Sequence, residues 1–244
     1  MKCFKLRGFE GFKSDYVNFY KKPFFNYKMI DRTIYRNPKD GELHVDGERL
    51  QKLCFPIKEN YDIFFSHSHS DVELAKNIAI ELEKNYEVKC FIDSEVWQFY
   101  EDVEEELAKV FPENDLDGIK IDIYMLLTEA LFRVIINTEH FFFLETDNSI
   151  DYLNNRVTYS PWLFLELSLA KQFHKKTIEK VALLEDKNKN RDFLKIDFRT
   201  VIDNFPIIEK EDLFDISKCQ NLIRQIYKKN AFENIIYQKL NKND

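Results

Sequence analysis

The feature that most constrains this fold is an alternation of short apolar runs with helical segments, beginning at Tyr61. Tyr61-Asp-Ile-Phe-Phe-Ser66 is typical of a buried strand, and from Asp71 apolar residues recur at helical spacing. Further strand-like runs cover 88–92 and 140–144. Strands that alternate with helices predict an α/β fold with a parallel sheet, in which ligands bind beyond the carboxyl ends of the strands. Functional residues are therefore expected within 66–71, 93–100 and 145–162.

The remaining elements continue this alternation. Helices are expected at about 100–110, 121–138, 161–174 and 218–228, and later strands near 178–184 and 193–198. Residues 1–60 differ in composition, because they hold four of the five glycines. Two of these glycines lie in turn-forming pairs, Asp40-Gly41 and Asp46-Gly47, close to the β-prone pieces 33–35 and 43–45. We interpret 1–60 as a small N-terminal extension of unknown role.

Composition excludes several classes of function. With only 5 glycines in 244 residues, the chain has no G-x-G-x-x-G or G-x-x-x-x-G-K-[ST] loop, which argues against Rossmann and P-loop chemistry. A net charge of −7 disfavours a nucleic-acid partner. Four widely spaced cysteines, Cys3, Cys54, Cys90 and Cys219, argue against a zinc ribbon and fit a reducing compartment. The chain shows no signal peptide and no long apolar run, so we expect a cytoplasmic protein with no membrane partner.

The loop after the first strand, Ser66-His67-Ser68-His69-Ser70-Asp71, allows several interpretations. Two histidines could suggest a metal, but the H-E-x-x-H pattern is missing, and we expect no metal. A Ser-His-Asp triad would lack the G-x-S-x-G elbow. A polar loop in which Ser70 or Asp71 caps the next helix is the simplest interpretation, and its place in the fold favours contact with a substrate. The acidic run at 101–106 is most simply a solvated helix face.

The segment from Ser160 to Ala170 is unusual because Glu166 is its only charge among eleven residues. Ser160 suits an N-cap and Pro161 a first helical position. Trp162 lies four residues before Glu166, so the two side chains share one helix face. Burying an unpaired carboxylate is costly. Glu166 therefore either pairs with a Lys or Arg elsewhere in the fold or is a partly desolvated functional carboxylate beside an aromatic ring.

Three motifs, taken in order, resemble Toll/interleukin-1 receptor (TIR) domains. Tyr61 to Asp71 resembles their first strand and loop, and Val88-Lys-Cys-Phe-Ile-Asp93 their second strand and the start of their BB loop. Ser160-Pro-Trp-Leu-Phe-Leu-Glu166 resembles the W-x-x-x-E segment of their third helix. The resemblance covers about 61–200. It implies a flavodoxin-like fold, with about five parallel strands flanked by helices, in a TIR domain at 61–244 that carries a helical insertion at about 111–138.

In active TIR domains the Glu of W-x-x-x-E is the catalytic residue of NAD⁺ cleavage. The resemblance therefore implies that Glu166 is catalytic, that Trp162 lies beside the substrate, and that NAD⁺ is a substrate rather than a cofactor. It further implies a pocket lined by Phe65, Ser66 and His67 and covered by Trp97 of the BB loop. The region 93–100 departs from the family because it lacks the Gly and Pro common there.

The pattern looks closer to bacterial members of the family, several of which act in antiphage defence. The implied activity is an NAD⁺ glycohydrolase or cyclase that releases nicotinamide and makes ADP-ribose, a cyclic isomer or a conjugate. Such a nucleotide product could signal to a downstream effector, and self-association through TIR surfaces is implied as well. The main alternative is a TIR interaction module without chemistry. A nucleoside deoxyribosyltransferase-like enzyme fits less well, because we find no second acidic residue placed as a nucleophile. A receiver domain fits less well still, because it needs paired acidic residues after the first strand, where this chain has Ser66-His67.

Overall fold

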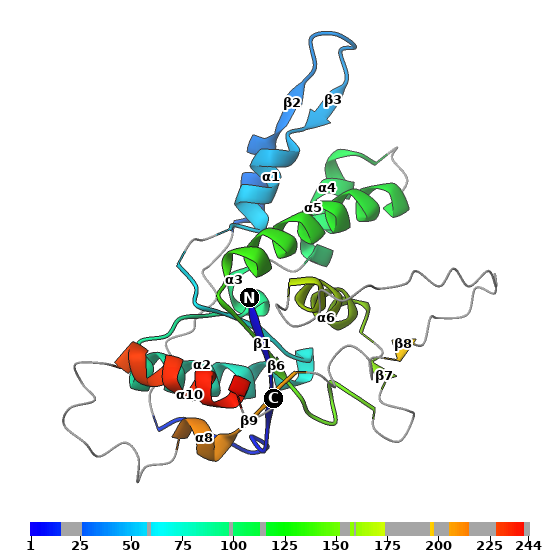
Figure 1. The fold of residues 1–244 in the computed structure, drawn as a ribbon. Helices are drawn as coiled ribbons and strands as arrows, with labels where there is room; N and C mark the ends of the chain where they lie inside the picture. The colour runs from blue at the N-terminus through cyan, green and yellow to red at the C-terminus, as the bar shows by residue number, and fades with distance from the viewer. Residues whose placement is uncertain are drawn as a thin grey trace. The chain divides into compact units, whose positions relative to one another are not determined.

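The chain divides into two compact units in a computed structural model (Figure 1). The sheet unit comprises 1–19, 61–91 and 138–244, and the hairpin unit comprises 20–60 and 92–137. The described residues are 1–15, 26–57, 60–97, 100–112, 116–151, 157–158, 160–173, 196–197, 205–214 and 228–241.

The sheet unit is built on five parallel strands. In order across the sheet they are β5 (Cys90–Phe91), β4 (Ile63–Ser66), β6 (His140–Leu144), β1 (Lys2–Arg7) and β9 (Ile207–Glu209). All residues of β4 and β6 are buried, as expected for parallel strands covered by helices on both faces. The predicted α/β fold with a five-stranded parallel sheet is therefore confirmed, including strands within 61–66, 88–92 and 140–144.

Helices cover both faces of this sheet (Figure 1). On one face, α2 (Val72–Tyr86) and α10 (Lys228–Asn241) lie side by side, and Phe232 of α10 packs against Phe142 with ring centroids 6.0 Å apart. On the other face, α6 (Pro161–Phe173) lies over β1, where the Cys3 thiol donates to the Ala170 carbonyl at 3.5 Å. We call these the helix-pair face and the α6 face. Each fully buried Phe in these layers contributes about 1.5–3 kcal/mol.

The prediction that 1–60 is an extension outside the main sheet is corrected by the position of β1. β1 pairs with β6 from Lys2↔His140 to Leu6↔Leu144 and with β9 on its other side, so it is an inner strand of the sheet. Its sequence holds three cations in six residues, which hid the strand from an apolar-run criterion. Counted from β4, the order β5-β4-β6 is the 2-1-3 part of the flavodoxin-like order 2-1-3-4-5. Here β1 occupies the fourth place.

The later elements match the predictions in part. The helix expected at 161–174 is α6. For the helix expected at 218–228, residues 218–227 lie outside the described residues, and α10 begins at Lys228. The strand expected near 178–184 also lies outside the described residues. Within the weak strand expected near 193–198, β8 (Ile196–Asp197) pairs antiparallel with β7 (Val157–Thr158), so it is not part of the five-stranded sheet. Two short elements complete the sheet unit, η2 (His69–Asp71) and α8 (Lys210–Phe214). Among the described residues, none of the helices combines the length and apolar character needed to span a bilayer.

The hairpin unit unites most of the expected extension with the expected insertion. Its elements are η1 (Tyr27–Thr33), β2 (Ile34–Arg36), β3 (Leu43–Val45), α1 (Gly47–Cys54), α3 (Asp93–Val96), α4 (Tyr100–Val110) and α5 (Leu116–Asn137). The predicted helix at 100–110 is confirmed, and α5 begins five residues before the predicted 121. Asp46-Gly47 marks a helix start rather than a turn, because the Asp46 carboxylate accepts from the Arg49 N–H at 3.0 Å.

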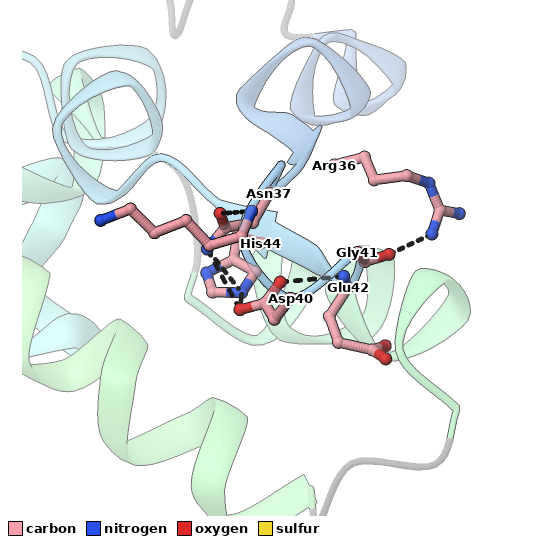
Figure 2. A network of polar contacts seen from close by, with 7 residues as sticks. Arg36, Asn37, Asp40, Gly41, Glu42 and His44 are labelled. Carbon is pink, nitrogen blue, oxygen red and sulfur yellow. Dashed lines mark hydrogen bonds and ion pairs between the residues drawn. The ribbon is translucent and has the colours of Figure 1, made fainter.

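The turn between β2 and β3 confirms the Asp40-Gly41 prediction (Figure 2). The Asp40 carboxylate accepts from the Glu42 N–H at 2.9 Å and lies 3.0 Å from Nε2 of His44. The pKa of Asp40 lies below its usual value, chiefly because of the hydrogen bond from the Glu42 N–H and, to a smaller extent, because of His44. Gly41 has a φ of 78°, which L side chains rarely adopt, and its carbonyl accepts from the Arg36 guanidinium. This turn therefore requires glycine.

Two glycine substitutions test this account of the hairpin unit. Gly41→Ala should lower the free energy of unfolding by about 1–2 kcal/mol, because a Cβ at positive φ is strained even though nothing lies within 4 Å of it. Gly118→Ala is the matched control within α5, where a Cβ also meets nothing within 4 Å. It should raise stability by up to about 1 kcal/mol, because Ala favours helix. Urea unfolding of both variants measures the two signs, and equal shifts would contradict the assigned turn.

Candidate active site

The candidate site lies at the carboxyl ends of the parallel strands. Ser66 is the last residue of β4, Arg7 is the last residue of β1, and Glu145 directly follows β6. The α6 face carries all three side chains. Ser66 and Phe143 are register partners, as are Phe143 and Lys5, and side chains two residues further along a strand point to the same face. This is the edge at which ligands bind in parallel α/β sheets, as the sequence pattern predicts.

Glu166 reaches this edge from α6. Its neighbours on the buried side of the helix are Leu163, Leu167 and Ala170, which follow helical spacing. The side chain is buried, with 3% of the residue exposed, and the carboxylate accepts from the Ser66 hydroxyl at 2.5 Å. A hydrogen bond to an ionised acceptor is short and stronger than a neutral one. The structure therefore joins two residues that lie 100 positions apart in the sequence.

The start of α6 follows the predicted capping. The Ser160 hydroxyl accepts from the Leu163 N–H at 3.3 Å, and Pro161 is the first helical residue. Trp162 is half-buried and lies one turn before Glu166 on the helix. This cap fixes where α6 begins. It thereby fixes the directions in which the side chains of Trp162 and Glu166 project from the helix.

The structure separates the other residues that the resemblance assigned to the pocket. Phe65 is fully buried and alternates with Ser66, so it lies on the helix-pair face, where its ring packs 6.4 Å from Phe142. His67 follows the strand and is 8% exposed, with Nδ1 3.2 Å from the Phe65 carbonyl oxygen. Among the expected lining residues, Ser66 bonds to Glu166 through its side chain.

Trp97 belongs to the hairpin unit and is a core residue there. Only 3% of it is exposed, its indole N–H donates to the Pro56 carbonyl at 3.1 Å, and its ring lies edge-on to Phe55. Trp97 is thus packed within the hairpin unit, and its expected role as a cover of the pocket stays a prediction. The Tyr100 ring lies tilted against that of Tyr124, with ring centroids 4.8 Å apart.

Asp71 connects two of the loops at the site edge. Its buried carboxylate accepts from the Thr146 hydroxyl at 2.5 Å and from the Asn148 amide at 2.7 Å. Thr146 and Asn148 lie in the loop after β6, so this network ties the start of α2 to that loop. Asp71 makes no side-chain cap to α2, in contrast to one of the expectations. The contacts of Asp71 also give no support to a Ser-His-Asp triad.

Three charged residues at this edge were missed in the sequence. Lys5 is a buried lysine, 4% exposed, in the same row of the sheet as Ser66. The Arg7 guanidinium forms a two-pronged ion pair with Glu145, from Nε at 2.5 Å and Nη2 at 2.9 Å. The Glu145 side chain is 2% exposed and that of Arg7 is 34% exposed. Glu145 falls in the predicted segment 145–162, whereas Lys5 and Arg7 could be found only by recognising the N-terminal strand.

Among the described residues, neither a reactive cysteine nor a cluster of metal-ligating side chains is found near Glu166. Burial raises the pKa of the Cys3 and Cys90 thiols well above the usual value and that of Cys54 to about 12, so these thiols are protonated at neutral pH. Metal-ligating residue types gather instead at the opposite end of β6, where donor atoms of Glu139, His140 and Glu233 lie within 4.8 Å of one another. The Lys2 ammonium lies 3.0 Å from the Glu233 carboxylate there.

The hairpin unit contains a pocket of about 490 Å³. Its lining is mostly apolar, and its ionisable members are His44 and Asp122. The full lining comprises Leu43, His44, Val45, Gly47, Leu50, Leu107, Phe111, Ile119, Asp122, Ile123, Met125 and Leu126. Asp122 is exposed and His44 is half-buried, so this lining holds no buried ionisable side chain comparable to Glu166, and the carboxyl edge of the sheet is the better candidate for chemistry.

Within the sheet unit, the structure thus brings Glu166 and Ser66 together, with Trp162 one turn away and the Arg7–Glu145 pair at the same edge. A scan of the chain against protein-family models gives no match, and searches of the curated proteins and of the solved structures give none either.

Removing the Ser66 hydroxyl tests the buried contact. Ser66→Ala leaves the Glu166 carboxylate buried with one donor fewer, which should lower the free energy of unfolding by about 1–3 kcal/mol. Ser70→Ala, at an exposed position in the same loop, should change it by less than about 0.5 kcal/mol. Urea titrations followed by circular dichroism compare the two variants. If both behave like wild type, the carboxylate does not depend on Ser66.

Proposed function

We propose that this chain is a TIR-type enzyme that cleaves the nicotinamide–ribose bond of NAD⁺, with Glu166 as its catalytic residue. The observation that carries the proposal is the buried Glu166 carboxylate, bonded to Ser66 at the carboxyl end of a parallel strand. Trp162 stands one turn earlier on the same helix, in the W-x-x-x-E spacing of the family. The parallel sheet, with β5, β4 and β6 in 2-1-3 order, is compatible with the flavodoxin-like fold of TIR domains.

A single carboxylate suits this reaction. Breaking the bond between ribose C1′ and the pyridinium nitrogen develops an oxocarbenium-like cation on the ribose. The bonding electron pair passes to nicotinamide, which leaves as a neutral molecule and needs no general acid. Water then adds to C1′ and releases a proton, giving ADP-ribose. Attack by an atom of the substrate itself would give a cyclic isomer.

Each residue has a distinct role in this proposal. The Glu166 carboxylate faces the developing positive charge and accepts hydrogen bonds from ribose hydroxyls, an electrostatic contribution that strengthens in the transition state. The Ser66 hydroxyl, at 2.5 Å, orients that carboxylate. Trp162, half-buried, offers an aromatic surface for the flat nicotinamide ring. Trp97 packs against Phe55 within the hairpin unit, and this proposal gives it no role.

The second candidate is a TIR interaction module that does no chemistry. It would explain the fold equally well, and it would treat Glu166 as a structural residue paired within the core. The placement of a carboxylate at the edge where ligands bind in parallel sheets favours the enzyme. An antiphage signalling role, with a nucleotide product that reaches a downstream effector, extends the same proposal.

Self-association is a further part of the proposal, because family active sites are completed by a neighbouring copy. Nicotinamide release per molecule should therefore rise with protein concentration across a dilution series, while light scattering reports the assembly state. A specific activity that stays constant over a wide range, with the protein monomeric throughout, would contradict this part and leave the catalytic role of Glu166 intact.

Glu166→Gln tests the catalytic role. The substitution keeps the shape and removes the negative charge, so nicotinamide release should fall by about 10²–10³-fold. Melting temperature should hold or rise, because the cost of burying a carboxylate is removed. Glu139→Gln, an exposed position at the opposite end of β6, is the control and should leave both readouts unchanged.

The interaction-module alternative predicts a different pattern for the same variant. Breaking a buried ion pair typically costs about 3–5 kcal/mol, so Glu166→Gln would melt much earlier. A variant that melts early and yet retains wild-type NAD⁺ turnover would make Glu166 structural and remove it from catalysis.

A further inference from the structure

The N-terminal strand brings a second charged group to the α6 face. Arg7 is the last residue of β1, and its side chain points to the same face as Lys5, which shares a row with Phe143 and Ser66. Two strand spacings and two residue steps put the Cα atoms of Arg7 and Ser66 about 12 Å apart. Since Glu166 bonds to Ser66, Arg7 and Glu166 belong to one end of the same face.

Glu145 fixes the orientation of the Arg7 guanidinium. The two-pronged contact uses Nε at 2.5 Å and Nη2 at 2.9 Å, and it holds the guanidinium plane at the edge of the sheet. The carboxylate side is buried, with 2% of the Glu145 side chain exposed, whereas 34% of the Arg7 side chain is exposed. A guanidinium carries five N–H donors in a rigid fork that matches phosphate oxygens. The exposed part of Arg7 is thus a cationic surface of fixed direction.

The chemistry of the proposed substrate needs such a group. The diphosphate of NAD⁺ is joined to the nicotinamide ribose through one methylene group, so it must lie within several ångströms of the bond that breaks. The chain has no glycine-rich phosphate loop to bind it. Lys5, one row behind Arg7 on the same face, is a second basic residue of β1.

We infer that Arg7, held by Glu145, binds the diphosphate of the dinucleotide whose glycosidic bond Glu166 cleaves. This inference rests on the proposed function and specifies its substrate class, a nicotinamide nucleotide recognised through its phosphates. Arg7 here is a binding residue, and it contributes equally before and during bond cleavage. Its loss should therefore raise KM and leave kcat nearly unchanged.

The test compares substrates with and without phosphate. The double variant Arg7→Gln/Glu145→Gln removes both charges and leaves neither one buried alone. For this variant, kcat/KM for NAD⁺ should fall about tenfold or more, because hydrogen bonds between charged groups are stronger than those between neutral groups. For nicotinamide riboside, which has no phosphate, kcat/KM should stay within about twofold of wild type.

A matched control lies at the other end of the same strand. Lys2 and Glu233 form an ion pair at 3.0 Å, and Lys2→Gln/Glu233→Gln makes the same change of charge there. This control variant should leave kcat/KM unchanged for both NAD⁺ and nicotinamide riboside. If the Arg7/Glu145 variant loses activity equally on NAD⁺ and nicotinamide riboside, or loses none on NAD⁺, the inference is overturned. Should that variant fail to fold by circular dichroism, Arg7→Lys replaces it, with the same selective loss on NAD⁺ expected from the missing fork.

Failure of the proposed function gives a separate result. If wild type releases nicotinamide from neither substrate, the catalytic proposal fails, and calorimetry with ADP-ribose then decides on Arg7 alone. Binding by wild type that weakens about tenfold in the Arg7/Glu145 variant, and not in the Lys2/Glu233 variant, supports the phosphate site. Absence of ADP-ribose binding by wild type, or equal binding by both variants, overturns it.

Discussion

The bond between the Ser66 hydroxyl and the buried Glu166 carboxylate is the interaction on which the candidate site depends. Burying a carboxylate is costly unless donors compensate it. The helix that carries Glu166 would otherwise present a continuous apolar side to the sheet, with Leu163, Leu167 and Ala170. A charge on this side is therefore a departure from the packing rule for buried helices, and such departures are expected at functional sites.

The rest of the α6 face extends this departure. Lys5, Arg7 and Glu145 are charged residues on strands, or directly after them, in a layer whose other side chains are mainly apolar. Arg7 and Glu145 satisfy each other by a two-pronged ion pair. A pair of this kind is weak evidence for stability, because its desolvation offsets much of its attraction. Its position at the carboxyl edge, next to the buried Glu166, is the reason to interpret it through ligand binding.

Most of the sheet could be predicted from the sequence, because β4 and β6 are continuous apolar runs and their helices have clear periodicity. The N-terminal strand could not be predicted, since Lys2, Lys5 and Arg7 interrupt its apolar residues and only its two neighbouring strands make it a strand. Glu166 stood out because it is the lone charge in its segment, and Ser66 because it ends a strand. The burial of Trp97 could not be predicted, since a buried tryptophan and an exposed one look alike in sequence, and strand alternation turns Phe65 away from the face that carries Ser66.

The central claim is that the carboxylate at this edge acts on NAD⁺. The most direct measurement is incubation of the purified chain with NAD⁺, followed by mass spectrometry of the products across a range of protein concentrations. The account predicts free nicotinamide together with ADP-ribose, its cyclic isomer or an ADP-ribose conjugate, in equal molar amounts. NAD⁺ recovered intact at every concentration, from protein that is folded by circular dichroism, would contradict it.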